Sequence, residues 1–520
     1  MKMQNNIKKV DIIIFTVLFI ITALVVFFNM VISPQYPMVY SQYNQSILYS
    51  IGKMIKSGKI PYKDVIDHKG IYILLIHYFA ELLGSSNHIG LYIIGTIAIF
   101  ISVLYLYKTF YLINLKCNIG ELPSTIISML SALAFAVMQS LYVVSYGTLQ
   151  SETFIVAGIT ITMHYFIKDL QNDNFSLKHT MLYGIICSFI LFIKANYNIY
   201  LVWIALYIFY RLIKEKNYSQ IFKHLKYGLI GIIIGITPGM LYAICNNCVK
   251  EMIYYTFIVN SIYSNTPYFG MNSKIESIFY TLSQFKIIYL VLISGMIEII
   301  VVNFKVLKKS LAKSISLSFL FIMLLLMVST LVSARDYSYY LIVVLPIACL
   351  IINYTLQVFY RVLNIIRIKP LKIALASVFV LAILLVTATL NVQYGRDLMV
   401  KNGKEQLKVA KFIKESYKNS FGGTGKKLFI LGSELYAYDY IGVIPDFRYF
   451  AVPMIEFKYY KEPYLEAIDY LSEKKADVVV IGRGASMSEF YKYTSLQSTL
   501  DSNYNMIGFN YGRTVLTKQW

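Results

Sequence analysis

Several ionisable side chains stand where long apolar runs of the sequence begin or end. The candidates for a functional site are Asp64, Asp67, His68, Lys69, Glu152, Lys194 and Arg335. A carboxylate is able to accept a proton or bind a metal ion, and a cation is able to bind a phosphate group. Ionisable groups at membrane depth are costly, so they are functional candidates by default. The first hypothesis is therefore base or phosphate-binding chemistry at a membrane surface.

A plainer interpretation applies to each of these residues taken singly. Charged loop residues are usually solvated, and a lysine near the end of a span commonly extends its ammonium group to water. Glu152 fits this interpretation least well, because it has no basic neighbour within several residues and lies against the edge of an apolar run.

Most of the chain must lie in a membrane to position these residues. Of its 520 residues, 57% are hydrophobic and 14% are charged, whereas a soluble chain has about 25% charged residues. Many apolar runs are long enough to cross a hydrocarbon core of about 30 Å. We predict about eleven transmembrane helices, at residues 10–32, 88–107, 124–144, 152–167, 180–193, 197–213, 227–246, 280–303, 315–333, 340–359 and 371–391.

Basic residues gather on alternate loops between these spans. The basic loops are 108–116, 168–178, 211–226, 305–313 and 361–372. This positive-inside pattern places them, together with the N-terminus, in the cytoplasm, and an odd number of spans then places the C-terminal region outside. The net charge of +21 follows from the same pattern. We therefore expect a multi-pass protein of the cell membrane, with the lipid bilayer as a partner and no nucleic acid.

The first extracytoplasmic loop, residues 33–87, contains structure of its own. Apolar residues recur at helical spacing over 41–58, between basic residues, which is typical of a helix that lies in the membrane interface. Residues 71–84 are apolar but too few for a full span, so they fit a re-entrant or interfacial piece.

The C-terminal region, residues 392–520, reads as a separate domain outside the membrane. Helical patterns at 401–418 and 464–474 alternate with buried strand patterns at 427–432 and 477–482. Apolar strands between helices predict a small α/β domain with a partly parallel sheet. The expected fold class is thus an α-helical polytopic membrane protein, residues 1–391, with a small extracytoplasmic α/β domain, residues 392–520.

Two strings in the first outer loop resemble a known family. They read Asn44-Gln-Ser-Ile-Leu-Tyr-Ser-Ile-Gly-Lys53 and Gly58-Lys-Ile-Pro-Tyr-Lys-Asp-Val-Ile-Asp-His-Lys-Gly70. With the span layout, the acidic residue after the third span and the outer C-terminal domain, they resemble the GT-C superfamily of polytopic glycosyltransferases. The bacterial branch related to the protein mannosyltransferases is the most similar.

The resemblance implies transfer of a hexosyl or pentosyl group from a polyprenyl-phosphate donor to an extracytoplasmic acceptor, which is a cell-wall polymer, a glycolipid or a protein. It assigns Lys69 to the lipid phosphate and Glu152 to a second acid of the site. Asn44, His68, Lys194 and Arg335 join the expected substrate-binding set. No organic cofactor is implied, no metal ligand is assigned, and the carboxylates leave a divalent metal open.

The chain departs from the family pattern where the family usually has an aspartate and this sequence has Asn44. An amide cannot accept a proton as a carboxylate does. Asp64 or Asp67 then supplies the base, or the acceptor chemistry differs, or the protein is a poor enzyme. A further alternative is that the chain is a non-catalytic partner in envelope glycosylation. A transporter or lipid flippase is a third alternative, which the nearly charge-free centres of the spans disfavour.

Overall fold

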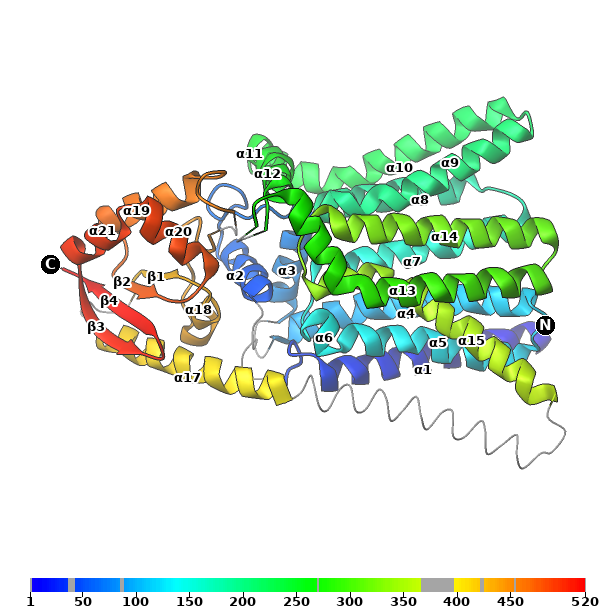
Figure 1. Cartoon of the computed structure of the whole chain (residues 1–520), viewed down its shortest axis with the longest axis horizontal. Helices are drawn as coiled ribbons and strands as arrows, with labels where there is room; N and C mark the ends of the chain where they lie inside the picture. The colour runs from blue at the N-terminus through cyan, green and yellow to red at the C-terminus, as the bar shows by residue number, and fades with distance from the viewer. Residues whose placement is uncertain are drawn as a thin grey trace.

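A bundle of long helices and a smaller α/β domain lie end to end in the computed structural model (Figure 1). The structure describes residues 2–35, 43–84, 88–268, 271–365, 397–420, 425–452 and 455–519. The long helices of the bundle are α1 (Lys2–Asn29), α4 (Ile89–Lys116), α5 (Glu121–Ser140), α7 (Ser151–Asn172), α8 (Leu177–Lys194), α9 (Ile199–Lys214), α10 (Tyr218–Cys245), α13 (Lys274–Val306), α14 (Lys309–Val332) and α15 (Leu345–Ile365).

Among the described residues, eight segments are long and apolar enough to cross a membrane, and the chain is a multi-pass membrane protein. One of these segments, Leu177–Lys214, contains both α8 and α9, which the short turn η2 (Ala195–Asn198) connects. Helix α7 is not among the eight. The number of eleven spans stays a prediction, because the segment 371–391 and the domain boundary after residue 391 lie outside the described residues.

The two ends of the bundle differ in their connections. Helices α4, α7, α9 and α13 end, and the helices that follow them begin, at the end farthest from the α/β domain (Figure 1). Four of the basic loops that the sequence assigns to the cytoplasm lie at this end, namely 108–116, 168–178, 211–226 and 305–313. The other end carries the short helices α6 (Tyr142–Ser145), α11 (Val249–Ile253) and α12 (Asn260–Asn265), the π-helical turn η3 (Tyr254–Val259) and the turn η4 (Ser338–Val344).

The first outer loop lies between the bundle and the α/β domain (Figure 1). The helix expected over 41–58 is α2 (Tyr43–Lys56), and the short apolar piece expected over 71–84 is the 13-residue helix α3 (Ile71–Leu83). The two helices pack closely, because a Cβ on Gly52 of α2 would lie 2.6 Å from the backbone oxygen of His77 in α3. Residues 57–70 connect them, and we call this segment the outer strap.

The C-terminal domain has the partly parallel sheet that the sequence predicts. Its strands are β1 (Leu428–Leu431), β2 (Val478–Ile481), β3 (Tyr504–Asn510) and β4 (Arg513–Lys518), in the order β1-β2-β4-β3. Strands β1 and β2 are parallel, whereas β4 pairs antiparallel with β2 and β3. The helices are α17 (Asp397–Asn419), α18 (Tyr436–Ile441), α19 (Glu462–Ser472), α20 (Ala485–Tyr493) and α21 (Leu496–Asn503).

The C-terminal domain is fastened to the first outer loop. The backbone N–H of Ile66 in the outer strap donates a hydrogen bond of 2.9 Å to the backbone oxygen of Arg448. Lys53 of α2 forms an ion pair with Asp439 of α18, and His88 Nε2 lies 3.7 Å from the same carboxylate. The domain therefore contacts the segment that carries most of the candidate site residues.

Candidate functional site

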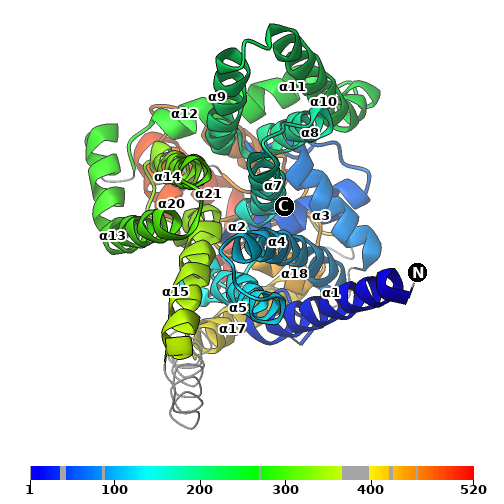
Figure 2. The same ribbon diagram turned by 90° about the vertical axis from the view of Figure 1, so that its right-hand side faces the viewer.

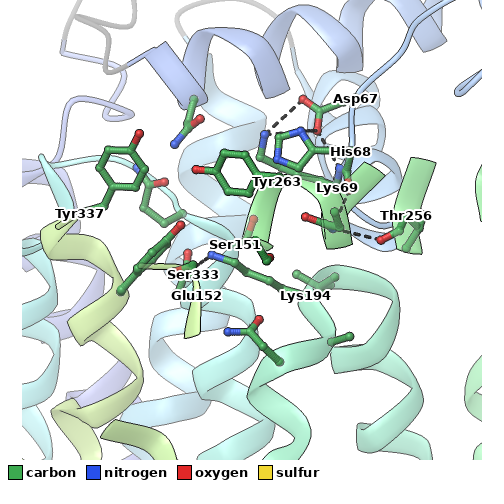
Figure 3. A pocket seen from close by; sticks show the side chains of 18 of the residues that line it. Asp67, His68, Lys69, Ser151, Glu152, Lys194, Thr256, Tyr263, Ser333 and Tyr337 are labelled. Carbon is green, nitrogen blue, oxygen red and sulfur yellow. Dashed lines mark hydrogen bonds and ion pairs between the residues drawn. The ribbon is translucent and has the colours of Figure 1, made fainter. Parts of the chain in front are cut away.

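A cavity of about 300 Å³ opens at the end of the bundle that faces the C-terminal domain (Figure 3). Its walls come from α2, the outer strap, the start of α7, the end of α8, the η3–α12 segment and the residues around η4. Two residues of the C-terminal domain complete them. The candidate residues on these walls are Asn44, Asp67, His68, Lys69, Glu152 and Lys194. The fold thus unites residues from segments that are far apart in the sequence.

Asp67 and Lys69 form the first charged pair of the cavity. The backbone N–H of Lys69 donates to Asp67 Oδ1 at 2.8 Å, and Lys69 Nζ lies 3.2 Å from Asp67 Oδ2. Burial acts to raise the pKa of Asp67, but Lys69 and His68 outweigh it and hold the pKa below its ordinary value. Burial lowers the pKa of His68 to about 4, with Asp67 opposing the shift and Lys69 and Lys194 adding to it. His68 is therefore neutral at neutral pH.

Glu152 and Lys194 form the second charged pair. Lys194 Nζ donates to Glu152 Oε1 at 2.8 Å, and the hydroxyl of Tyr197 donates to the same oxygen at 3.0 Å. Glu152 lies in the first turn of α7 and Lys194 in the last turn of α8, where the helix dipoles favour these charges. Lys194 Nζ also lies 3.8 Å from the ring centre of Tyr340, which adds a cation–π contact.

Gly70 brings the two charged pairs to the same cavity. Its backbone N–H lies 3.4 Å from the backbone oxygen of Ile193, near the end of α8. A Cβ at this position would lie only 2.0 Å from the backbone oxygen of Phe192. A glycine therefore allows the outer strap to approach α8, which places Lys69 and Lys194 on neighbouring walls (Figure 3).

An aromatic wall faces these charges, and its residues were not among the candidates from the sequence. It consists of Tyr263, Tyr337, Tyr339 and Tyr340. The side-chain amide of Asn44 donates to the hydroxyl of Tyr339 at 2.9 Å, and the His68 ring lies 5.0 Å from that of Tyr263. The run of tyrosines that follows the ninth predicted span was the available signal, because it stands at the same membrane depth as the other candidates.

Two candidates from the sequence do not line the cavity. Asp64 is exposed, and its Oδ2 accepts the backbone N–H of Ile60 at 2.8 Å, which closes a turn of the outer strap. Arg335 is buried and donates to the backbone oxygens of Tyr263 and Thr266 at 3.3 and 3.4 Å. Arg335 therefore stabilises the backbone of the segment that carries Tyr263, on the side away from the cavity.

The cavity offers two kinds of group for chemistry. Its carboxylates are able to accept a proton, and its two lysines are able to bind a phosphate group. Within the described ranges, no group of three or more histidine, cysteine, aspartate or glutamate side chains is placed to hold a metal ion.

Comparison with known structures defines the class of the fold. The structure is similar to ArnT from Cupriavidus metallidurans bound to undecaprenyl phosphate, with 12% sequence identity, a TM-score of 0.57 and coverage of 96% of this chain and 97% of that one. The apo structure of the same protein gives 12% identity, a TM-score of 0.56 and coverage of 98% of both chains. ArnT is a GT-C glycosyltransferase, so this chain has the GT-C membrane glycosyltransferase fold that its sequence resembles.

Comparison with family models gives the particular family. Residues 2–392 match the model described as the competence-induced protein Ccs4 N-terminal domain, and the chain belongs to this family. The search of curated proteins gives no match.

Proposed function

We propose that this protein is a membrane glycosyltransferase that moves a sugar from a polyprenyl-phosphate donor to an extracytoplasmic acceptor. The observation that carries the proposal is the cavity itself, in which Asp67–Lys69 and Glu152–Lys194 meet at one end of a GT-C fold. The undecaprenyl phosphate bound to the similar ArnT supports a lipid phosphate as the donor group.

The two lysines of the cavity are suited to hold the phosphate of the donor. The phosphate becomes the leaving group and gains negative charge as its bond to the sugar breaks. Lys69 and Lys194 lie on neighbouring walls, and both lower the pKa of His68, so we propose that they share one phosphate. Glu152 and Tyr340 position Lys194 through the 2.8 Å hydrogen bond and the cation–π contact.

Asp67 is the preferred general base, because it lines the cavity and Asp64 does not. In the proposed step, an acceptor hydroxyl forms a bond to the anomeric carbon, Asp67 takes the hydroxyl proton, and polyprenyl phosphate leaves with the electron pair of the broken bond. In the free protein, Lys69 holds the pKa of Asp67 low. When the donor phosphate draws Lys69 away, the pKa of Asp67 rises and the carboxylate becomes a stronger base.

The end of the bundle that carries the cavity is proposed to face the outside of the cell. The basic loops lie at the opposite end, and basic loops remain in the cytoplasm. The N-terminus is then cytoplasmic, and the C-terminal domain, which lines the cavity through Ala451 and Val452, is then extracytoplasmic.

Mass analysis of envelope polymers tests this function in cells. Deletion of the gene is expected to remove one sugar substituent, and a plasmid copy is expected to restore it. The Glu152→Gln copy should fail to restore it, because Lys194 loses its charged partner. Glu121→Gln is the matched control, since Glu121 is exposed at the start of α5 and does not line the cavity. An unchanged envelope in the deletion strain would argue against the function.

Asn44 favours a second candidate function, that of a non-catalytic partner of a glycosyltransferase. Its amide occupies the cavity and donates to Tyr339, in the place where the resemblance implies a carboxylate. The Asn44→Asp variant separates the two candidates. Transfer by Asn44→Asp alone, with none by the natural chain, would show that the natural chain lacks its base and acts as a partner.

A further inference from the structure

A second and larger cavity lies at the opposite end of the bundle, away from the candidate active site. Its volume is about 1190 Å³, and it opens where α7, α9 and α13 end and α14 begins. Figure 2 looks onto this end of the helices. The positive-inside pattern places it at the cytoplasmic face of the membrane.

Four of the five basic side chains around this cavity have no acidic partner among the described residues. Its basic residues are Lys116, Arg211, Lys214, Lys308 and Lys313. Asp173, the acidic residue of the lining, pairs with Arg211. The four lysines are exposed, and none of them makes a side-chain hydrogen bond or an ion pair with any residue that the structure describes. The cavity therefore carries uncompensated positive charge.

Two further donors on its walls lack acceptors. The indole nitrogen of Trp203 and the side-chain nitrogen of Gln171 are buried, and neither has a hydrogen-bond partner among the described residues. A buried donor without an acceptor is costly. Solvated loop lysines alone would explain the charge, but they would not explain these two donors at the same cavity. A ligand rich in acceptor oxygens explains both.

Apart from Asn118 and Ser314, the rest of the lining is aliphatic or aromatic. Leu206 and Tyr210 of α9 are each 58% exposed, and Leu311 and Leu317 of α14 continue the apolar wall. An inorganic anion would leave this wall uncovered, whereas the chains of a lipid would cover it. Basic pockets between transmembrane helices at the cytoplasmic face are suited to the headgroups of anionic lipids.

We propose that this cavity binds the phosphate headgroup of an anionic membrane lipid, with the lipid chains along the wall of α9 and α14. The proposal does not depend on sugar transfer. The same phosphate chemistry is present in phospholipids and in polyprenyl phosphate, and binding measurements distinguish these sources.

Native mass spectrometry of the full chain in an uncharged detergent tests the proposal. The probes are phosphatidylglycerol, phosphatidylcholine and polyprenyl phosphate. The cavity variant combines Lys116→Gln, Lys214→Gln, Lys308→Gln and Lys313→Gln. The matched control combines Lys168→Gln, Lys178→Gln, Lys223→Gln and Lys226→Gln, which removes the same charge from exposed sites at the same end of the bundle.

Phosphatidylglycerol is expected to bind the natural chain and the control variant equally, and the cavity variant about tenfold more weakly. Phosphatidylcholine, which has no net charge, should bind all three weakly. Equal losses in the two lysine variants, or equal binding of the two phospholipids by the natural chain, would overturn the proposal.

A second variant tests the two buried donors that lack acceptors, without changing the charge. Gln171→Leu with Trp203→Phe should weaken phosphatidylglycerol binding several-fold, and no weakening would count against the site. Binding of polyprenyl phosphate is measured with the Lys69→Gln variant, so that less of this lipid binds at the candidate active site. If polyprenyl phosphate binds more tightly than phosphatidylglycerol, and the cavity variant loses this binding, the ligand is the isoprenoid carrier. If the two lipids bind equally, the cavity binds anionic lipids in general.

Discussion

The two carboxylates of the candidate functional site, Asp67 and Glu152, are held in different ways. Asp67 lies in a loop and accepts a backbone N–H and a lysine, whereas Glu152 lies in a helix and accepts a lysine and a tyrosine hydroxyl. The partner of Asp67 is on the same short strap, and the partner of Glu152 is on another helix. This difference favours Asp67 as the group that changes protonation and Glu152 as the group that positions Lys194.

The pH dependence of stability tests the ion pair of Asp67. Its pKa is lowered in the folded protein, so its stabilising contribution is complete above the ordinary carboxyl pKa of about 4 and is lost as the pH falls through the lowered value. Asp67→Asn should therefore lower the melting temperature at neutral pH, and the difference from the natural chain should disappear only in acid below pH 4. A difference that vanishes between pH 5 and 7 would show a raised pKa instead.

The buried pair of Glu152 and Lys194 gives a second prediction. Glu152 is only 1% exposed, so Lys194→Met leaves a buried carboxylate without its cation. The variant should lose up to about 3 kcal/mol of unfolding free energy. Adding Glu152→Gln removes the unpaired charge and should recover most of the loss. Thermal unfolding in detergent measures both. A double variant no more stable than Lys194→Met alone would show that the charge is not buried as described.

The sequence predicted that the candidate residues lie near the ends of helices. It did not predict which of their side chains point into the cavity. Asp64 and Asp67 stand on the same strap, yet a local turn draws the Asp64 carboxylate to the backbone of Ile60. Arg335 also stands at the end of a span, but the backbone oxygens of Tyr263 and Thr266 hold it behind the cavity wall. The first of these contacts is a local turn and the second joins segments that are distant in sequence, and a periodic pattern reports neither.

At the scale of elements, the outer strap depends on its contact with α8. Gly70 permits this contact because no Cβ stands between the strap and the backbone oxygen of Phe192. The strap also bonds to the C-terminal domain through Ile66. The position of Lys69 therefore depends on elements on both sides of it.

Gly70→Ala should displace the strap, because its Cβ would lie 2.0 Å from a backbone oxygen. A shift of about 1 Å in a positioning group costs on the order of 10²-fold in rate, so we expect a loss of that size in sugar transfer. Gly120→Ala is the matched control, since the nearest atom to its added Cβ is at 3.7 Å. Restoration of the envelope sugar would be slow with the first variant and normal with the second. Equal rates for the two variants would show that sugar transfer does not depend on the contact between the outer strap and α8.

Buried strands were easier to predict from the sequence than exposed strands. Strands β1 and β2 are almost completely buried and gave continuous apolar runs, which predicted both strands and a partly parallel sheet. Strand β3 is mostly exposed, so it gave no comparable run. Its turn to β4 places Tyr511 and Gly512 at positive φ, which is typical of a two-residue hairpin, but only Gly512 signals this in the sequence.

At the scale of the whole molecule, the two ends of the bundle have different characters. The end that faces the C-terminal domain carries paired charges in a cavity of about 300 Å³. The other end carries unpaired lysines around a cavity of about 1190 Å³. Composition and charge pattern predicted the membrane class and the grouping of the basic loops. They did not predict either cavity, because cavities depend on how helix ends meet.

Cysteine labelling in a background without the native cysteines tests the orientation. Ser498 is exposed in the C-terminal domain, and Ser219 is exposed at the start of α10, at the other end of the bundle. A membrane-impermeant reagent should label Ser498→Cys in intact cells and Ser219→Cys only after lysis. The opposite pattern would reverse the topology and place the candidate site in the cytoplasm.

The most direct measurement of the central claim is sugar transfer by the purified protein. Radiolabelled lipid-linked sugars from parent membranes serve as the donor, and envelope polymers of the deletion strain serve as the acceptor. The natural chain should transfer label, Asp64→Asn should remain within a few-fold of it, and Asp67→Asn should fall by about 10²–10⁴-fold, as expected for loss of a general base. No transfer by the natural chain, or equal transfer by Asp67→Asn, would contradict the assignment of this cavity as a glycosyltransferase active site.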